Sequence, residues 1–518
     1  MRDFFARAAT AFRLRRPLSW ASAAPARQPR HQPAVVAIEW LAARASIIRL
    51  TLLALLVAGT YRLSPALAML IAAVGGIVSR RQYCALVRES LRSESGAIGA
   101  GLAVMLLIGF CCITPPGAPD DALRDIASAA YGFDYHRMYP HADIQRYNAY
   151  LAFDHLLALL SHAVGAQGAL HVVQGFCMVA FLALFVLMAR RISPVLRAEH
   201  YALIALAFAT PLSARIFLAR PEVILTVWGL FAAVCTRRWH VALWVAVGAL
   251  LTTGYWLAAL YFPFAVLLPS RFRTKLLLGM LLTGWSFGFW HLASHGTYID
   301  SLSLLSSWPK NRVAVVQETG SFLVLLLNPY VVALVLLAGV SCTARRLGAR
   351  DLQVLLLVAY FCLSGMVRYA AVWTGLLVFL ALPLLELRRV ENLWLRAGLL
   401  FFPFYCAAAC FGSAVPFSTL PSFSYPAGSY VLTGFNAATF ATPFFNPGTV
   451  SVAPSMELGA NTRAVQTLAT GLSEGTLDCN KLLAESFTHV VENRLRSVPA
   501  CLRLEGVQGA WRQWQVVR

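Results

Sequence analysis

The 518 residues are 59% hydrophobic and 13% charged, and an apolar fraction of this size exceeds what an ordinary soluble core can bury. The composition therefore excludes a typical soluble protein and predicts an all-α polytopic membrane protein. The formal net charge of +20 lies mostly on alternate connections between apolar runs, as the positive-inside rule expects. Because no nucleic-acid-binding motif accompanies this charge, the sequence indicates no nucleic-acid partner.

Apolar runs recur through residues 45–413, the predicted transmembrane domain, and they indicate about 13 membrane-spanning helices. They are preceded by an arginine-rich segment, residues 1–44, which lacks the apolar stretch of a cleaved signal peptide and is expected to be a cytoplasmic tail. The runs cover residues 45–61, 64–79, 97–114, 168–189, 200–213, 221–236, 239–251, 255–269, 274–290, 321–340, 352–366, 370–386 and 396–413.

The positions of the basic residues predict the orientation of the chain. The positive-inside rule places connections rich in arginine and lysine in the cytoplasm. We therefore expect a multi-pass protein of a bacterial inner membrane, with a cytoplasmic N-terminus and a periplasmic C-terminus. The basic connections are residues 80–92, 190–197, 237–238, 271–275, 345–350 and 388–396.

One connection on the predicted outer side, residues 115–154, concentrates carboxylates. Polar groups gathered at a membrane surface suggest a site that binds a charged ligand or moves protons. Pro119 precedes an aspartate pair, which predicts a helix start, with a short helix to Tyr131 and a second helix from Tyr147 to Leu160. The carboxylates of this segment are Asp120, Asp121, Asp125, Asp134, Asp143 and Asp154.

Two further segments are predicted outside the membrane: the connection 291–320 and the C-terminal residues 414–518. The C-terminal segment is expected to form a small α+β domain with short strands and one helix near Leu482–Leu495. Cys479 and Cys501 lie in this domain, away from the membrane spans. An oxidising compartment would join them in a disulfide, and no Cys-x-x-Cys or histidine-rich spacing indicates zinc.

Three short motifs relate this layout to a known family: PDDALRD at residues 119–125, FLARPEVIL at 217–225 and MVRYAAVW at 366–373. In this order among apolar runs they resemble the GT-C-type integral membrane glycosyltransferases, which take a sugar from a polyprenyl-phosphate carrier. The resemblance covers about residues 95–415. It implies an inverting transferase with a catalytic aspartate in the acidic outer connection and a glycan, lipid or protein acceptor. The chain departs from many members in having two extra apolar runs before that connection.

The same residue types suit the chemistry of sugar transfer from a lipid phosphate. A carboxylate must accept the proton of the acceptor hydroxyl, and Asp120 and Asp121 are the candidate general bases; the alternative is that they only cap a helix. Positive groups must stabilise the departing phosphate, and the planar guanidinium of arginine donates two hydrogen bonds at once. The candidates for binding the donor phosphate are Arg215, Arg220, Lys310, Arg312 and Arg368.

Simpler roles stay open for these residues. Arg220 could anchor the chain at the membrane interface with Glu222 as its partner, and loop cations such as Lys310 are commonly solvated. The resemblance implies no certain cofactor, and it leaves a divalent cation, Mg²⁺ or Mn²⁺, open. The competing functions are a transporter or flippase of lipid-linked sugars and a non-catalytic membrane assembly subunit.

The candidate acceptor subsite is the run Asp134, Tyr135 and His136 in the acidic connection. These side chains offer a carboxylate, a phenol and an imidazole, which can bind sugar hydroxyls. An ordinary surface loop would also contain such residues, so both interpretations remain open at this point.

Overall fold

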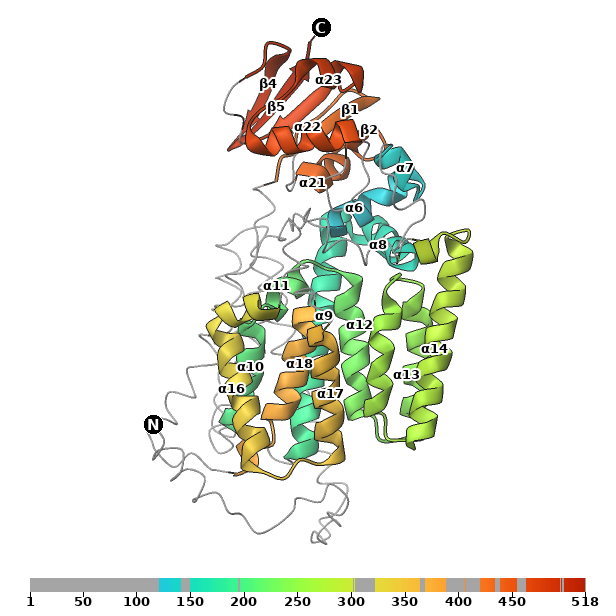
Figure 1. The fold of residues 1–518 in the computed structure, drawn as a ribbon, viewed down its shortest axis with the longest axis vertical. Coiled ribbons are helices and arrows are strands. Elements are labelled where there is room, and N and C mark those ends of the chain that lie inside the picture. The colour runs from blue at the N-terminus through green and yellow to red at the C-terminus, as the bar shows by residue number, and fades with distance from the viewer. Residues whose placement is uncertain are drawn as a thin grey trace, which may run out of the picture.

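The chain is mainly helical with a small C-terminal sheet (Figure 1). A bundle of long helices carries the sheet domain at one end, and the short helices of the acidic segment lie between the two. The computed structural model describes residues 121–140, 150–193, 196–300, 302, 322–363, 369–387, 406, 420–433, 438–453, 463–493, 495 and 498–517.

The bundle is organised around α18, all of whose residues are buried. Short helices join the long ones: α11 (Leu212–Phe217), η2 (Ala232–Val234), η6 (Phe322–Leu327) and α19 (Leu384–Leu387). The long helices are α9 (Ala166–Ile192), α10 (Ala198–Ala209), α12 (Pro221–Phe231), α13 (Arg238–Thr252), α14 (Phe272–Ala293), α16 (Pro329–Ala344), α17 (Ala349–Leu363) and α18 (Ala370–Ala381).

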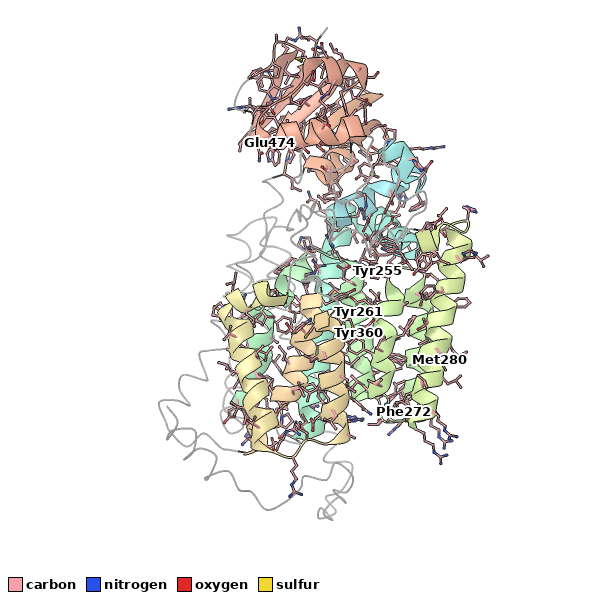
Figure 2. The ribbon with its side chains drawn as sticks, viewed as in Figure 1. Tyr255, Tyr261, Phe272, Met280, Tyr360 and Glu474 are labelled. Carbon is pink, nitrogen blue, oxygen red and sulfur yellow. A yellow bond between two sulfur atoms is a disulfide. The ribbon has the colours of Figure 1, made fainter. Side chains whose placement is uncertain are left out.

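The environment of α14 is the opposite of that of α18. Many of its large apolar side chains are exposed, among them Met280 at 56% and Trp285 at 51%, and Phe272 and Met280 point away from the bundle (Figure 2). A continuous apolar surface of this kind suits contact with lipid. In the part of the chain that the structure describes, α9 and α14 are the helices long and apolar enough to cross a membrane, and the other apolar helices are shorter.

The predicted span at residues 255–269 does not form a regular α-helix. It forms the 3-10 helix η3 (Ala258–Leu267), which contains Pro263. Proline has no backbone N–H to donate, and its ring clashes with the preceding turn of an α-helix. The apolar composition predicted burial correctly, but the proline prevents the expected α-helix.

The contact between α12 and α13 is unusually close. The rings of Trp228 and Trp244 stack with centroids 4.2 Å apart, and each indole N–H donates to the backbone carbonyl of the other residue. Gly248 makes this packing feasible, because a Cβ there would lie 2.2 Å from Cζ2 of Trp228. The pair satisfies both indole donors without water.

The acidic segment forms α6 (Asp121–Ser128), η1 (Ala129–Tyr131), α7 (Tyr135–Met138) and α8 (Leu151–Val164). The predicted short helix to Tyr131 is confirmed, and the second predicted helix begins four residues later than Tyr147. Apolar side chains of α6 and α8 belong to the main core of the bundle. The acidic segment is therefore packed onto the helices.

The C-terminal domain contains a five-stranded sheet with strand order β2-β1-β3-β5-β4. β1 is parallel to β2 and β3, whereas β5 is antiparallel to β3 and β4. A disulfide joins Cys479 on α23 to Cys501 before β4, with 5.8 Å between the Cα atoms. The elements are β1 (Ser429–Thr433), α21 (Ala438–Phe445), β2 (Val450–Ala453), α22 (Arg463–Glu474), α23 (Cys479–Ala484), β3 (His489–Glu492), β4 (Leu502–Gln508) and β5 (Trp511–Val516).

The prediction of one helix near Leu482–Leu495 is wrong for most of that range, and the domain also contains α21 and α22. α23 ends at Ala484, and β3 follows at His489–Glu492. This strand has the sequence HVVE, whose paired valines favour a pleated strand. It is paired with a strand on each side, so tertiary pairing determines its conformation.

The sheet domain packs directly on the acidic segment. The phenol of Tyr131 donates to the carbonyl of Val450 at 2.6 Å, and Ser451 Oγ donates to the carbonyl of Arg137 at 3.0 Å. Gly448 has a φ of +73°, and a Cβ there would lie 2.9 Å from the carbonyl oxygen of Ala130. The edge of the sheet therefore holds η1 and α7 in place.

Candidate functional site

A buried polar cluster joins α6, α7 and α8. Asp125 and Asp154 both have 0% exposure. The phenol oxygen of Tyr135 lies 3.0 Å from Asp154 Oδ2 and 3.3 Å from Asp125 Oδ1, and Ser128 Oγ lies 3.0 Å from the same oxygen of Asp154. We call these four residues, together with Arg124, the acidic cluster.

Arg124 neutralises one of the two carboxylates. Its Nε and Nη2 atoms donate to Asp125 Oδ1 at 3.2 and 3.0 Å. Its guanidinium carbon lies 5.1 Å from the ring centroids of both Tyr135 and Tyr150, so two aromatic rings add cation–π attraction. A buried charge is stable only when it is paired and hydrogen-bonded, and these contacts meet that need for Arg124.

The electrostatics of the acidic cluster favour a protonated Tyr135. Burial, and next the charge of Asp154, raise the pKa of Tyr135 well above its ordinary value, although Arg124 opposes this effect. The phenol therefore carries its proton throughout the physiological range and can donate it to only one carboxylate at a time. Two carboxylates around one hydroxyl form an arrangement that can hold or transfer a proton.

Local backbone geometry directs Tyr135 toward α6. Gly132 and Phe133 adopt φ values of +68° and +58°, which reverse the chain after η1. Asp134 then caps α7, because its side chain accepts the N–H of His136 at 2.9 Å. Asp134 and His136 thus lie on the outer side of this turn while Tyr135 is buried, so the structure does not bring the three together as one acceptor subsite.

Of the two predicted general bases, Asp121 lies at the start of α6. Asp120 falls outside the described residues, and Asp121 is the first residue of α6, described for its backbone alone. Arg124, the nearest cation along the sequence, forms an ion pair with Asp125. The members of the acidic cluster on α6 therefore lie within about two helical turns of Asp121.

A second buried ionic group lies between α11 and α12. Arg215 Nη2 donates to Glu222 Oε1, and Arg220 Nη1 lies 3.7 Å from the same oxygen. All three side chains are buried. The pairing of Arg220 with Glu222, expected as its simpler role, is thus present. The other candidates for binding the donor phosphate, Lys310, Arg312 and Arg368, lie outside the described residues.

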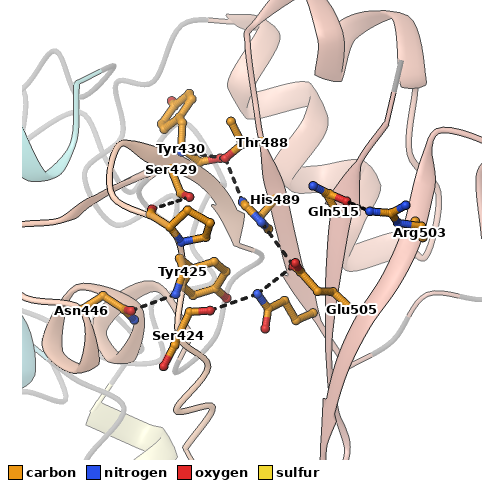
Figure 3. A network of polar contacts seen from close by, with 12 residues as sticks. Ser424, Tyr425, Ser429, Tyr430, Asn446, Thr488, His489, Arg503, Glu505 and Gln515 are labelled. Carbon is orange, nitrogen blue, oxygen red and sulfur yellow. Dashed lines mark hydrogen bonds and ion pairs between the residues drawn. The ribbon is translucent and has the colours of Figure 1, made fainter.

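A third network, in the sheet domain, joins a hydroxyl, an imidazole and a carboxylate (Figure 3). His489 contacts Thr488 Oγ1 at 2.9 Å and Glu505 Oε2 at 3.3 Å. This order has the composition of a nucleophilic triad, but Thr488 Oγ1 also accepts the N–H of Tyr430 at 2.9 Å and lies 3.1 Å from its carbonyl. The hydroxyl is used in joining β3 to β1, so we assign this network a structural role.

The sequence shows Asp125 and Asp154 only as members of an acidic stretch, and it does not predict that their side chains lie close together. One signal for Asp154 was available. It is a carboxylate within the mostly apolar run LAFDHLLALL, where an unpaired charge would be unfavourable. No local signal pairs it with Tyr135, because the contact depends on the turn before α7 and on the packing of α6 against α8.

Within the described ranges, no group of three or more His, Cys, Asp or Glu side chains is arranged to hold a metal ion. Comparison with protein-family models gives no match. A search among curated proteins likewise finds no significantly similar relative.

Proposed function

We propose that this protein is a membrane-embedded glycosyltransferase that moves a sugar from a polyprenyl-phosphate donor to an extracytoplasmic glycan, lipid or protein acceptor. The observation that supports this proposal most is the acidic cluster. Asp125 and Asp154 come from separate helices and are buried together at the end of the bundle that faces the sheet domain. Burying two carboxylates destabilises a fold unless they are compensated, so we attribute a functional role to the pair.

The general base in this proposal is Asp121, in the first turn of α6, or Asp120, which precedes it in the sequence. The positive end of the helix dipole stabilises a carboxylate at that position. The acidic cluster would hold the base in position, because it joins α6 to α7 and α8 through hydrogen bonds between side chains that are fully or almost fully buried. Asp125 or Asp154 would be the base if the aspartate pair only caps α6.

The buried arginines support the donor half of the proposal. Arg215 and Arg220 bring two guanidinium groups to the single carboxylate of Glu222, at the N-terminal end of α12, where the helix dipole also favours an anion. Guanidinium groups bind phosphate through paired hydrogen bonds. Lys310, Arg312 and Arg368 stay in the proposal as further phosphate ligands.

The proposed reaction is a single displacement. The aspartate accepts the proton of the acceptor hydroxyl while the hydroxyl oxygen forms a bond to the anomeric carbon. The bond from that carbon to the phosphate oxygen breaks, and its electron pair stays on the phosphate, where the arginines stabilise the charge. Attack opposite the leaving group inverts the anomeric centre.

The test uses purified protein in lipid nanodiscs with a panel of polyprenyl-phosphate sugars and a lipid extract as acceptor, and mass spectrometry detects the product. Asp120→Asn and Asp121→Asn keep the side-chain shape but remove the proton acceptor. Turnover should fall about 100-fold or more in the variant that lacks the base, with an unchanged melting temperature. Asp143→Asn, in the same segment, is the matched control.

Normal turnover in both Asn variants would indicate that the general base is Asp125 or Asp154 instead. If no donor gives a product but labelled lipid-linked sugar crosses the membrane of proteoliposomes, the protein is a flippase and not a transferase. Absence of both activities would favour an assembly subunit.

A further inference from the structure

Three helix ends at the end of the bundle away from the sheet domain (Figure 1) each carry a basic residue. Arg191 comes from the last turn of α9, Lys275 from the first turn of α14 and Arg350 from the start of α17. Lys275 is 9% exposed, and the two arginines are half-buried. We call these three residues the basic triad.

Electrostatic repulsion links the members of the basic triad. Arg350 acts on both Arg191 and Lys275 as a neighbouring like charge. Arg191 donates to the carbonyls of Ala233 and Cys235 at 3.1 and 3.2 Å, and Lys275 Nζ donates to a carbonyl at the end of η3 at 2.6 Å. These contacts are with neutral groups, so the three positive charges remain.

The carboxylates at this end of the described structure are all paired with other cations. Asp351 forms a two-point contact with Arg345 at 2.6 and 2.7 Å. Glu386 and Glu199 lie 3.5 and 4.0 Å from Arg197. Among the described residues, no carboxylate pairs with the basic triad.

Three partly desolvated cations from three different helices repel one another, and an anion that approached them would relieve this repulsion. We propose that the basic triad binds a phosphate group, either the headgroup of an anionic phospholipid or a free phosphate anion. A guanidinium and an ammonium group both donate to phosphate oxygens, and basic pockets between helices at a membrane surface bind anionic headgroups. The site lies at the opposite end of the bundle from the acidic cluster, and its existence does not depend on transferase activity.

The variant Arg350→Gln tests the proposal, because Arg350 makes no hydrogen bond to other described residues and its loss should leave the fold intact. Arg346→Gln removes an exposed charge from the same connection and is the matched control. The protein is placed in nanodiscs of phosphatidylcholine alone or mixed with phosphatidylglycerol. Melting temperature and native mass spectrometry of retained phospholipid are measured for each.

We expect phosphatidylglycerol to stabilise the wild type and the Arg346→Gln control, and to remain bound in native mass spectra. Arg350→Gln should bind it about fivefold more weakly at low ionic strength, since one surface cation contributes about that factor. Lys275→Gln should give the same loss and serves as a second variant.

Inorganic phosphate is titrated into phosphatidylcholine nanodiscs as the second arm. Stabilisation by phosphate that Arg350→Gln abolishes would identify a soluble anion as the ligand of the same site. Equal responses of wild type and Arg350→Gln in both arms would overturn the proposal. An equal loss of phosphatidylglycerol binding in Arg350→Gln and Arg346→Gln would also overturn it, because general surface attraction would then explain the effect.

Discussion

Replacing Tyr135 by Phe removes one hydroxyl from the acidic cluster and keeps the ring beside Arg124. The lost oxygen lies 3.0 Å from Asp154 and 3.3 Å from Asp125, both with 0% exposure. A hydrogen bond to a charged group contributes about 1.5–3 kcal/mol. We expect the free energy of unfolding to fall by about that amount. Turnover should fall as well, because α6 would lose one of its ties to α8.

Tyr131→Phe is the matched control, since it deletes the same hydroxyl from a bond to a neutral carbonyl, Val450 O at 2.6 Å. A neutral hydrogen bond contributes only about 0.5–1.5 kcal/mol. Unfolding in detergent, followed by tryptophan fluorescence, measures both variants under the same conditions. If Tyr135→Phe is no more destabilising than Tyr131→Phe, the phenol of Tyr135 does not form a strong hydrogen bond to a charged carboxylate. The acidic cluster would then not stabilise the position of the general base as proposed.

Three further predictions concern packing, covalent structure and pH. Gly248→Ala should lower the stability of the protein by about 1–3 kcal/mol because the new Cβ would overlap a tryptophan of α12. Gly339→Ala is the control, since a Cβ there meets nothing within 4 Å, and thermal unfolding compares the two variants. Non-reducing peptide mapping should recover the Cys479–Cys501 pair, and its removal should destabilise the sheet domain by about 2–4 kcal/mol. Burial lowers the pKa of His489 below its ordinary 6.5, so the unfolded state binds the extra proton and stability should decrease as pH falls below that value. His489→Gln should remove this pH dependence. Hydrogen exchange of the sheet amides, measured as a function of pH, tests this prediction. Identical profiles in the wild type and His489→Gln would contradict the reasoning.

Several features of the protein could be predicted from composition and local sequence pattern. Among the described residues, apolar runs predicted most helices of the bundle, the aspartates after Pro119 predicted the start of α6, and the isolation of Cys479 and Cys501 indicated that they could pair. Such features depend on residues close together in the chain, whose conformational preferences act locally. Pro263 was also visible in the sequence, and its missing N–H could have predicted that η3 would not be a regular α-helix.

Which charged groups contact one another depends on the tertiary structure. Asp125, Tyr135 and Asp154 come together because a turn with left-handed backbone geometry and the packing of α6 on α8 bury them in one place. Likewise, the strand at His489–Glu492 depends on neighbours supplied by β1 and β5. Contacts between distant segments depend on how helices and strands pack, and local sequence preference does not contain that information.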